Sequence, residues 1–124
     1  TIGLVEHATA QFELDVRLKD GCTKREHLAS AWRQTGIMPD ELKAVPKLPL
    51  SIHYLWATFL ELHRRRKSNG FGPVPLQYLD VEAWGRLTNR KLDVWELQAI
   101  LGVDDAYLTV SAKHSKSKGT EDGN

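Results

Sequence analysis

The sequence has little of what a secreted, disulfide-bonded or membrane protein needs. Its 124 residues include one cysteine, Cys22, which excludes an internal disulfide and favours a reducing cytoplasm. No stretch approaches the roughly 18 uninterrupted apolar residues that indicate a membrane span. The first residues lack a basic patch followed by an apolar run, so we expect no secretion signal.

An excess of charge is also missing. The 17 lysines and arginines are nearly balanced by 16 aspartates and glutamates, which leaves a net charge of +1. Nonspecific binding to a phosphate backbone needs a concentrated positive field, so this balance argues against nucleic acid as a partner. The one basic run, residues 63–67, ends a predicted helix, where cations also stabilise the negative end of the helix dipole.

Motifs for catalysis and for metal or cofactor binding are absent. The chain contains no CxxC, HExxH or GxSxG, and no Lys-Ser or Lys-Thr pair follows the glycines of "GFGPVP". Cys22 and His27 are close in sequence, but nothing in the sequence around them favours a thiolate. We therefore predict no catalytic residue, no cofactor and no metal ligand, and a protein that is not an enzyme.

What the sequence does contain is mainly helical patterning. In "TKREHLASAWRQTG", Thr23 can cap the start of a helix, and the Glu26 side chain can accept a hydrogen bond from the backbone N–H of Thr23 in return. Gly36 can take the left-handed conformation that ends the helix. A longer helix is predicted from about residue 50 to residue 68. Its apolar stripe consists of Ile52, Leu55, Trp56, Phe59 and Leu62.

The segment "FELDVRLK", residues 12–19, has a different pattern. Apolar and charged residues alternate strictly, which is typical of a half-buried β-strand. A lone strand leaves its backbone donors and acceptors unpaired. Three outcomes are open: pairing with a second short segment, pairing with another copy, or absorption into a helix that begins near Leu4. We favour pairing.

The stretch "RLTNRKLDVWEL", residues 86–97, ends one helical pattern and begins another. The apolar residues of the first pattern are Leu76, Leu79, Ala83, Trp84 and Leu87. In the second pattern the Asp93 side chain can cap the new helix, and the Glu96 side chain can bond the backbone N–H of Asp93 in return. Asp104 falls on the apolar stripe of that helix, so we expect a break at Gly102 with Asp104 capping a final helix.

Together these patterns predict a mainly α protein. The expected fold is a small orthogonal bundle of about four to five helices, with a short N-terminal β-strand or extended segment and a disordered C-terminal tail. The expected organisation is an extended segment at residues 1–20, a helical domain at 21–110 and a disordered tail at 111–124. The tail "SAKHSKSKGTEDGN" offers nothing to bury.

A helix-turn-helix at residues 77–102 can read DNA or present a surface to another protein. A DNA-reading helix exposes Arg, Lys, Asn or Gln near its start, whereas this one begins with Val94, Trp95 and Glu96. The sequence therefore favours a protein partner. Four tryptophans are many for this length, and one that a small domain leaves exposed is a candidate anchor.

Three segments resemble the phage tail assembly chaperones, small proteins encoded near the tape measure gene of tailed phages and prophages, and their frameshift-linked companions. These segments are "REHLASAWRQTG", "LPLSIHYLWATFLELHRRR" and "GFGPVPLQYLDVEAWGRLTNRKLDVWELQAIL", and the resemblance covers about residues 21–108. Its most specific part consists of Pro75, Ala83, Trp84, Leu87, Thr88, Leu92, Trp95, Glu96, Leu97, Asp104, Ala106, Tyr107 and Leu108. Asn89 and Val94 depart from the pattern, which has Gly and Pro there, but they suit the same left-handed helix end and first helical turn.

The resemblance implies a non-catalytic chaperone in the cytoplasm of the bacterial host cell. It would bind the tape measure protein, the tail tube protein or both during tail morphogenesis, and self-association stays open. The candidate partner-binding residues are Trp84, Trp95, Tyr107, Arg64, Arg65 and Arg66. The alternative is a small DNA-associated phage protein with a helix-turn-helix, terminase-like or regulatory.

Overall fold

The computed structural model of the chain is mainly helical, as the sequence predicts. It describes residues 2–122, with side chains for residues 3–115. Within this part no strand forms, and a short 3₁₀ turn at Leu50–Ile52 precedes one of the helices. The helices are α1 (Ile2–Leu14), α2 (Lys24–Thr35), α3 (Asp40–Lys43), α4 (His53–Arg64), α5 (Tyr78–Thr88) and α6 (Val94–Asp122).

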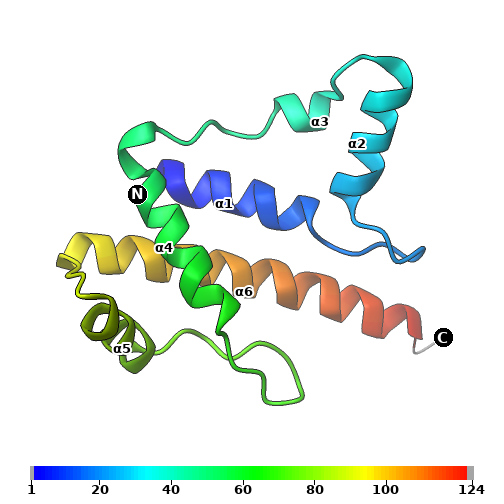
Figure 1. The fold of residues 1–124 in the computed structure, drawn as a ribbon. Helices are drawn as coiled ribbons and strands as arrows, with labels where there is room; N and C mark the ends of the chain where they lie inside the picture. The colour runs from blue at the N-terminus through cyan, green and yellow to red at the C-terminus, as the bar shows by residue number, and fades with distance from the viewer. Residues whose placement is uncertain (1, 123–124) are drawn as a thin grey trace.

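Helices α1 and α6 form the centre of the fold and run side by side in the same direction (Figure 1). Leu4 and Ala8 of α1 are fully buried. Near the start of the pair Val5 packs against Gly102, and near its end Glu13 Oε2 lies 2.8 Å from His114 Nε2. Helix α4 crosses this pair, and the buried core lies where the three helices meet.

The core is built from apolar side chains of four helices and one loop. It consists of Leu4, Ala8, Leu55, Phe59, Leu62, Leu76, Val81, Ala99, Ile100 and Val103. The stripe predicted for the long helix is confirmed, with Leu55, Phe59 and Leu62 buried and Ile52 and Trp56 packed against them. That helix is shorter than predicted, because α4 ends at Arg64.

The N-terminal strand prediction was wrong. Residues 12–14 belong to α1, and the rest of the alternating segment forms only an isolated bridge between Arg17 and Thr23. The longer pattern Leu4, Ala8 and Phe12 has helical spacing, and burying it against α4 and α6 outweighs the short alternation. The outcome is the third of those left open: most of the predicted extended segment, from Ile2 to Leu14, is helix α1, which supplies part of the core.

The predicted caps of α2 at Thr23 and Gly36 are confirmed. Thr23 Oγ1 accepts a hydrogen bond from the backbone N–H of Glu26 at 3.1 Å, and Gly36 has a φ of 72°. The helix nevertheless has no buried residue, and 43% of Trp32 is exposed. Its apolar stripe therefore does not join the core.

The break predicted at Gly102 was also wrong, since α6 continues through it. Asp104 is buried and forms an ion pair with Arg66, whose side chain is buried as well. Its other carboxylate oxygen accepts a hydrogen bond from the backbone N–H of Leu76 at 3.0 Å, while Arg66 donates to the carbonyl of Val74 at 2.9 Å. An aspartate on a buried stripe is tolerated because these partners satisfy it.

Helix α6 extends beyond residue 110, where the helical domain was predicted to end, and runs to Asp122. His114 contacts Glu13 of α1, and this polar contact continues the α1–α6 pairing beyond its apolar part. Residues 123–124 lie outside the described residues. Within residues 2–122, no helix combines the length and the apolar character that a membrane crossing requires.

Two helix-interior glycines, Gly102 and Gly85, give a matched test of this packing. A Cβ at Gly102 would lie 3.6 Å from Val5 Cγ2, an ordinary contact, whereas at Gly85 it would lie 2.9 Å from the backbone oxygen of Arg90. We expect Gly102→Ala to raise the free energy of unfolding by about 0.5–1 kcal/mol, because glycine is the poorer helix former. Gly85→Ala should lower it by about 1–3 kcal/mol through overpacking. Urea unfolding measures both, and changes of the same sign would contradict the packing.

Candidate functional site

Helices α5 and α6 meet at a tight corner, residues 78–98, that corresponds to the predicted helix-turn-helix. Asn89 ends α5 with a φ of 55°, and its backbone N–H donates to the carbonyl of Gly85. The backbone N–H of Asp93 donates to Glu96 Oε1 at 2.8 Å, which confirms the predicted hydrogen bond between Glu96 and the cap position. Tyr54 of α4 also bonds Glu96, which lowers the pKa of Glu96 and raises the pKa of Tyr54 to about 12.

Large apolar side chains are exposed on this corner. Leu79 and Leu87, which the sequence pattern assigned to a buried stripe, are 74% and 78% exposed, because α5 turns Val81 towards the core instead. The corner's exposed apolar side chains are Tyr78, Leu79, Leu87, Val94 and Trp95. Several exposed apolar side chains on two adjoining helices are typical of a surface that binds another protein.

A groove of about 680 Å³ runs along the corner. Trp84 lines it and is held in place by a hydrogen bond from its Nε1 to Glu61 Oε2 at 2.8 Å. Arg90 lies over the Trp84 ring at 5.7 Å and pairs with the same glutamate at 3.6 Å. Glu61 of α4 therefore orders two residues that line the groove, Trp84 and Arg90.

The structure separates the six candidate partner-binding residues into two groups. Trp84 and Trp95 belong to the corner, with Trp84 half-buried and Trp95 49% exposed. Arg64 and Arg65 are exposed near the end of α4. Arg66 is instead buried, with its guanidinium 4.6 Å from the ring centroid of Tyr107, and Tyr107 is half-buried on α6, away from the corner.

His63 joins Arg66 and Tyr107 in this packed group. Its ring stacks on Phe59 at 5.3 Å and meets the Tyr107 ring edge-on at 4.4 Å. Arg66 Nε donates a hydrogen bond to His63 Nδ1 at 3.1 Å, which requires that nitrogen to carry no proton. Burial and then the charge of Arg66 lower the pKa of His63, so the imidazole is neutral at neutral pH. His63 also lines a second groove of about 660 Å³, with Phe12 and Tyr107.

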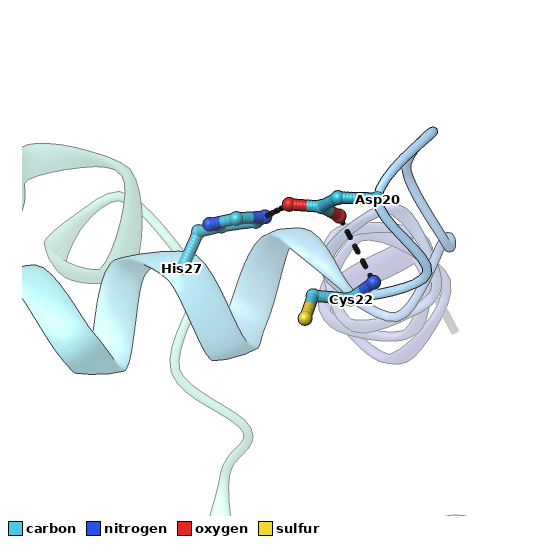
Figure 2. Close-up of side chains that lie close together, drawn as sticks. All are labelled: Asp20, Cys22 and His27. Atoms are coloured by element: carbon cyan, nitrogen blue, oxygen red, sulfur yellow. Dashed lines mark hydrogen bonds and ion pairs between the residues drawn. The ribbon is translucent and has the colours of Figure 1, made fainter.

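A third feature lies at the turn before α2, where Asp20, Cys22 and His27 come together (Figure 2). Asp20 Oδ2 is 2.7 Å from His27 Nε2, and Asp20 Oδ1 accepts a hydrogen bond from the backbone N–H of Cys22 at 3.0 Å. The charge of Asp20 is the main cause that raises the pKa of the Cys22 thiol. The thiol is therefore protonated at neutral pH, which disfavours a nucleophilic role.

Sequence reasoning considered Cys22 and His27 as a pair and missed Asp20. The turn at Asp20 and Gly21 brings the carboxylate to His27: Gly21 has a φ of 85°, and Leu18 donates its backbone N–H to the carbonyl of Cys22 at 2.8 Å. This reversal places position 20 beside the first turn of α2. An Asp-Gly pair just before a helix cap could have indicated it.

Comparison of the sequence with known protein families gives a match. A family model described as phage tail assembly chaperone matches residues 31–109, which is more than half of the 124-residue chain. The chain belongs to the phage tail assembly chaperone family. The resemblance found in the sequence is thus confirmed. No curated protein and no solved structure matched the chain.

The matched range of this tail assembly chaperone contains the whole corner. Asn89 is left-handed, the conformation that suits the glycine of the sequence pattern, and Val94 is the first residue of α6, where the pattern has proline. Helix α1 and the Asp20–Cys22–His27 cluster lie outside the matched range, although α1 supplies part of the core.

The lowered pKa of His63 predicts how the stability of the chaperone depends on pH. In the unfolded chain His63 has an ordinary pKa near 6.5 and binds a proton more readily than in the folded chain. The contribution of the neutral His63 to the free energy of unfolding is therefore fully present above pH 6.5 and is lost as the pH falls below it. The free energy of unfolding should fall as the pH drops from about 7 towards 5. His63→Phe keeps the ring packing, removes the titration, and should flatten this dependence.

The matched control for this experiment is His53→Gln, because His53 is exposed and bonds only the carbonyl of Leu48 among the contacts described. Urea unfolding across the pH range compares the two variants with the unmodified chain. His53→Gln should leave the slope of stability against pH unchanged. A His63→Phe variant with the slope of the unmodified chain would contradict the buried neutral imidazole.

Proposed function

We propose that this member of the tail assembly chaperone family binds the tape measure protein, the tail tube protein or both during tail morphogenesis in the cytoplasm of the bacterial host. The proposal includes no catalytic step. The family supports an assembly role. We infer the partners from this role, because an assembly chaperone must bind an apolar surface of another tail protein reversibly.

The observation that carries the proposal is the exposed apolar corner beside an ordered groove. Isolated exposed apolar residues are ordinary, but here five large ones lie on the two helices that flank one turn. Trp95 has the properties of an anchor, since a tryptophan that becomes buried on binding contributes a large apolar area. Trp84, already fixed by Glu61, offers a rigid wall that loses little entropy on binding.

The remaining candidate residues fit the proposal unequally. Arg64 and Arg65 are exposed and can assist association with an acidic partner, mainly through the rate of encounter. Arg66 and Tyr107 act within the fold and are not part of the proposed surface. The first turn of α6 exposes Val94 and Trp95, which favours a protein partner over the DNA-binding alternative.

The test is co-expression of the chain with a tape measure protein from the same phage or prophage, followed by pull-down and size-exclusion chromatography. A soluble complex that resists raised salt is expected. Trp95→Ala should weaken it by about 30-fold, which corresponds to a hot-spot loss of about 2 kcal/mol. Leu87→Ala should weaken it in the same direction.

Trp32→Ala is the matched control, because Trp32 is exposed to a similar extent, 43%, but lies on α2 outside the corner. It should leave binding unchanged, and circular dichroism should show that all variants remain folded. If no complex forms and the chain instead binds DNA through Arg64 and Arg65 in a salt-sensitive way, the DNA-associated alternative replaces this proposal.

A further inference from the structure

The side chains of Asp20, Cys22 and His27 form a compact set of metal-binding donors (Figure 2). One carboxylate oxygen, one sulfur and one imidazole nitrogen lie within 4.8 Å of one another, and this is the one such three-residue group among the side chains that the structure describes. We propose that these three residues bind a single divalent cation of the zinc class at the turn before α2.

The chemistry of the donors selects the cation. Sulfur and imidazole ligands suit Zn²⁺ and the metals that replace it, whereas Mg²⁺ and Ca²⁺ take oxygen ligands. Three protein ligands of the types found here leave a fourth tetrahedral position. Glu26, whose side chain hydrogen-bonds the Cys22 thiol, is one candidate to fill that position, and water is the other.

The geometry needs only small adjustments to accept the ion. In a tetrahedral zinc site with bonds of about 2.0–2.1 Å, an oxygen and a nitrogen ligand lie about 3.3 Å apart. Asp20 Oδ2 and His27 Nε2 are 2.7 Å apart, so they separate by roughly 0.6 Å as the ion enters. A sulfur ligand lies about 3.5 Å from each of them, and the thiol, within 4.8 Å of both, approaches by no more than about 1.3 Å.

Two structural elements position the three ligands, the turn at residues 18–22 and helix α2. Asp20 and Cys22 lie on a turn closed by the Leu18-to-Cys22 backbone hydrogen bond and by Arg17, whose guanidinium donates to the carbonyl of Gly21 at 2.6 Å. His27 lies on α2, one turn after its Thr23 cap. A bound ion would therefore join the turn to the helix, and α2 has no buried residue that does this through apolar packing.

The cation site is independent of the proposed function. Its ligands lie outside residues 31–109 and outside the corner, so its failure would leave the partner-binding proposal standing, and the reverse also holds.

The test is titration of the reduced full-length chain with Co²⁺ at neutral pH, followed by displacement with Zn²⁺. We expect a saturable 1:1 complex with a sulfur-to-cobalt charge-transfer band and the strong visible bands of tetrahedral cobalt, both abolished by Zn²⁺. Cys22→Ser should remove the charge-transfer band. Asp20→Asn and His27→Gln should each weaken binding by at least about 10-fold, because even outer-shell losses cost roughly 10–100-fold.

The matched controls are His53→Gln and Glu41→Gln, which remove an exposed imidazole and an exposed carboxylate elsewhere on the surface. Both should bind Co²⁺ like the unmodified chain. Zn²⁺ should also raise the midpoint of thermal unfolding of the unmodified chain and leave that of Cys22→Ser unchanged. Absence of a charge-transfer band, or a band that survives in Cys22→Ser, would overturn the proposal.

Discussion

The buried ion pair between Arg66 and Asp104 is the interaction on which the rest of the architecture depends. Two charges inside a protein are tolerated only when their hydrogen-bonding capacity is nearly filled. Here the carboxylate also receives the N–H of Leu76, and the guanidinium also bonds Val74 and the ring of His63. The pair therefore ties three segments together: the end of α4, the loop that leads to α5, and the middle of α6.

This arrangement explains how a short chain can expose an apolar corner without losing its fold. The loop after α4 is fixed at Val74 and Leu76, so α5 starts from a defined position and turns Val81, not Leu79 or Leu87, towards the core. The Trp84 and Arg90 contacts to Glu61 then hold α5 against α4. The apolar residues left outside are available for a partner, and the core does not need them.

Local signals in the sequence predicted the local structure well. The Thr23 and Gly36 caps of α2 and the Glu96 contact at the start of α6 depend on neighbours within a few residues, and each is present. The errors arose where distant residues decide. The alternation from Phe12 onwards was outweighed by packing against α4 and α6, and the partner of Asp104 lies 38 residues away in sequence.

The candidate sites follow the same division. The sequence indicated a corner with two tryptophans. It did not show that Trp84 is hydrogen-bonded to Glu61 of α4 while Trp95 is exposed, because both depend on how α4 packs in the fold. Arg66 resembled its neighbours Arg64 and Arg65 in a basic run, and only the fold shows that it is buried. Asp20 was missed because a backbone reversal, not its spacing, brings it to His27.

The central claim is tested most directly by a double-mutant cycle on this ion pair, with Arg66→Met, Asp104→Leu and the double variant compared by urea unfolding. Each single variant should lose about 3–5 kcal/mol, since it leaves an unpaired buried charge. The double variant should lose clearly less than the sum, by more than about 1 kcal/mol of coupling. Single losses below about 1 kcal/mol that add without coupling would contradict the account.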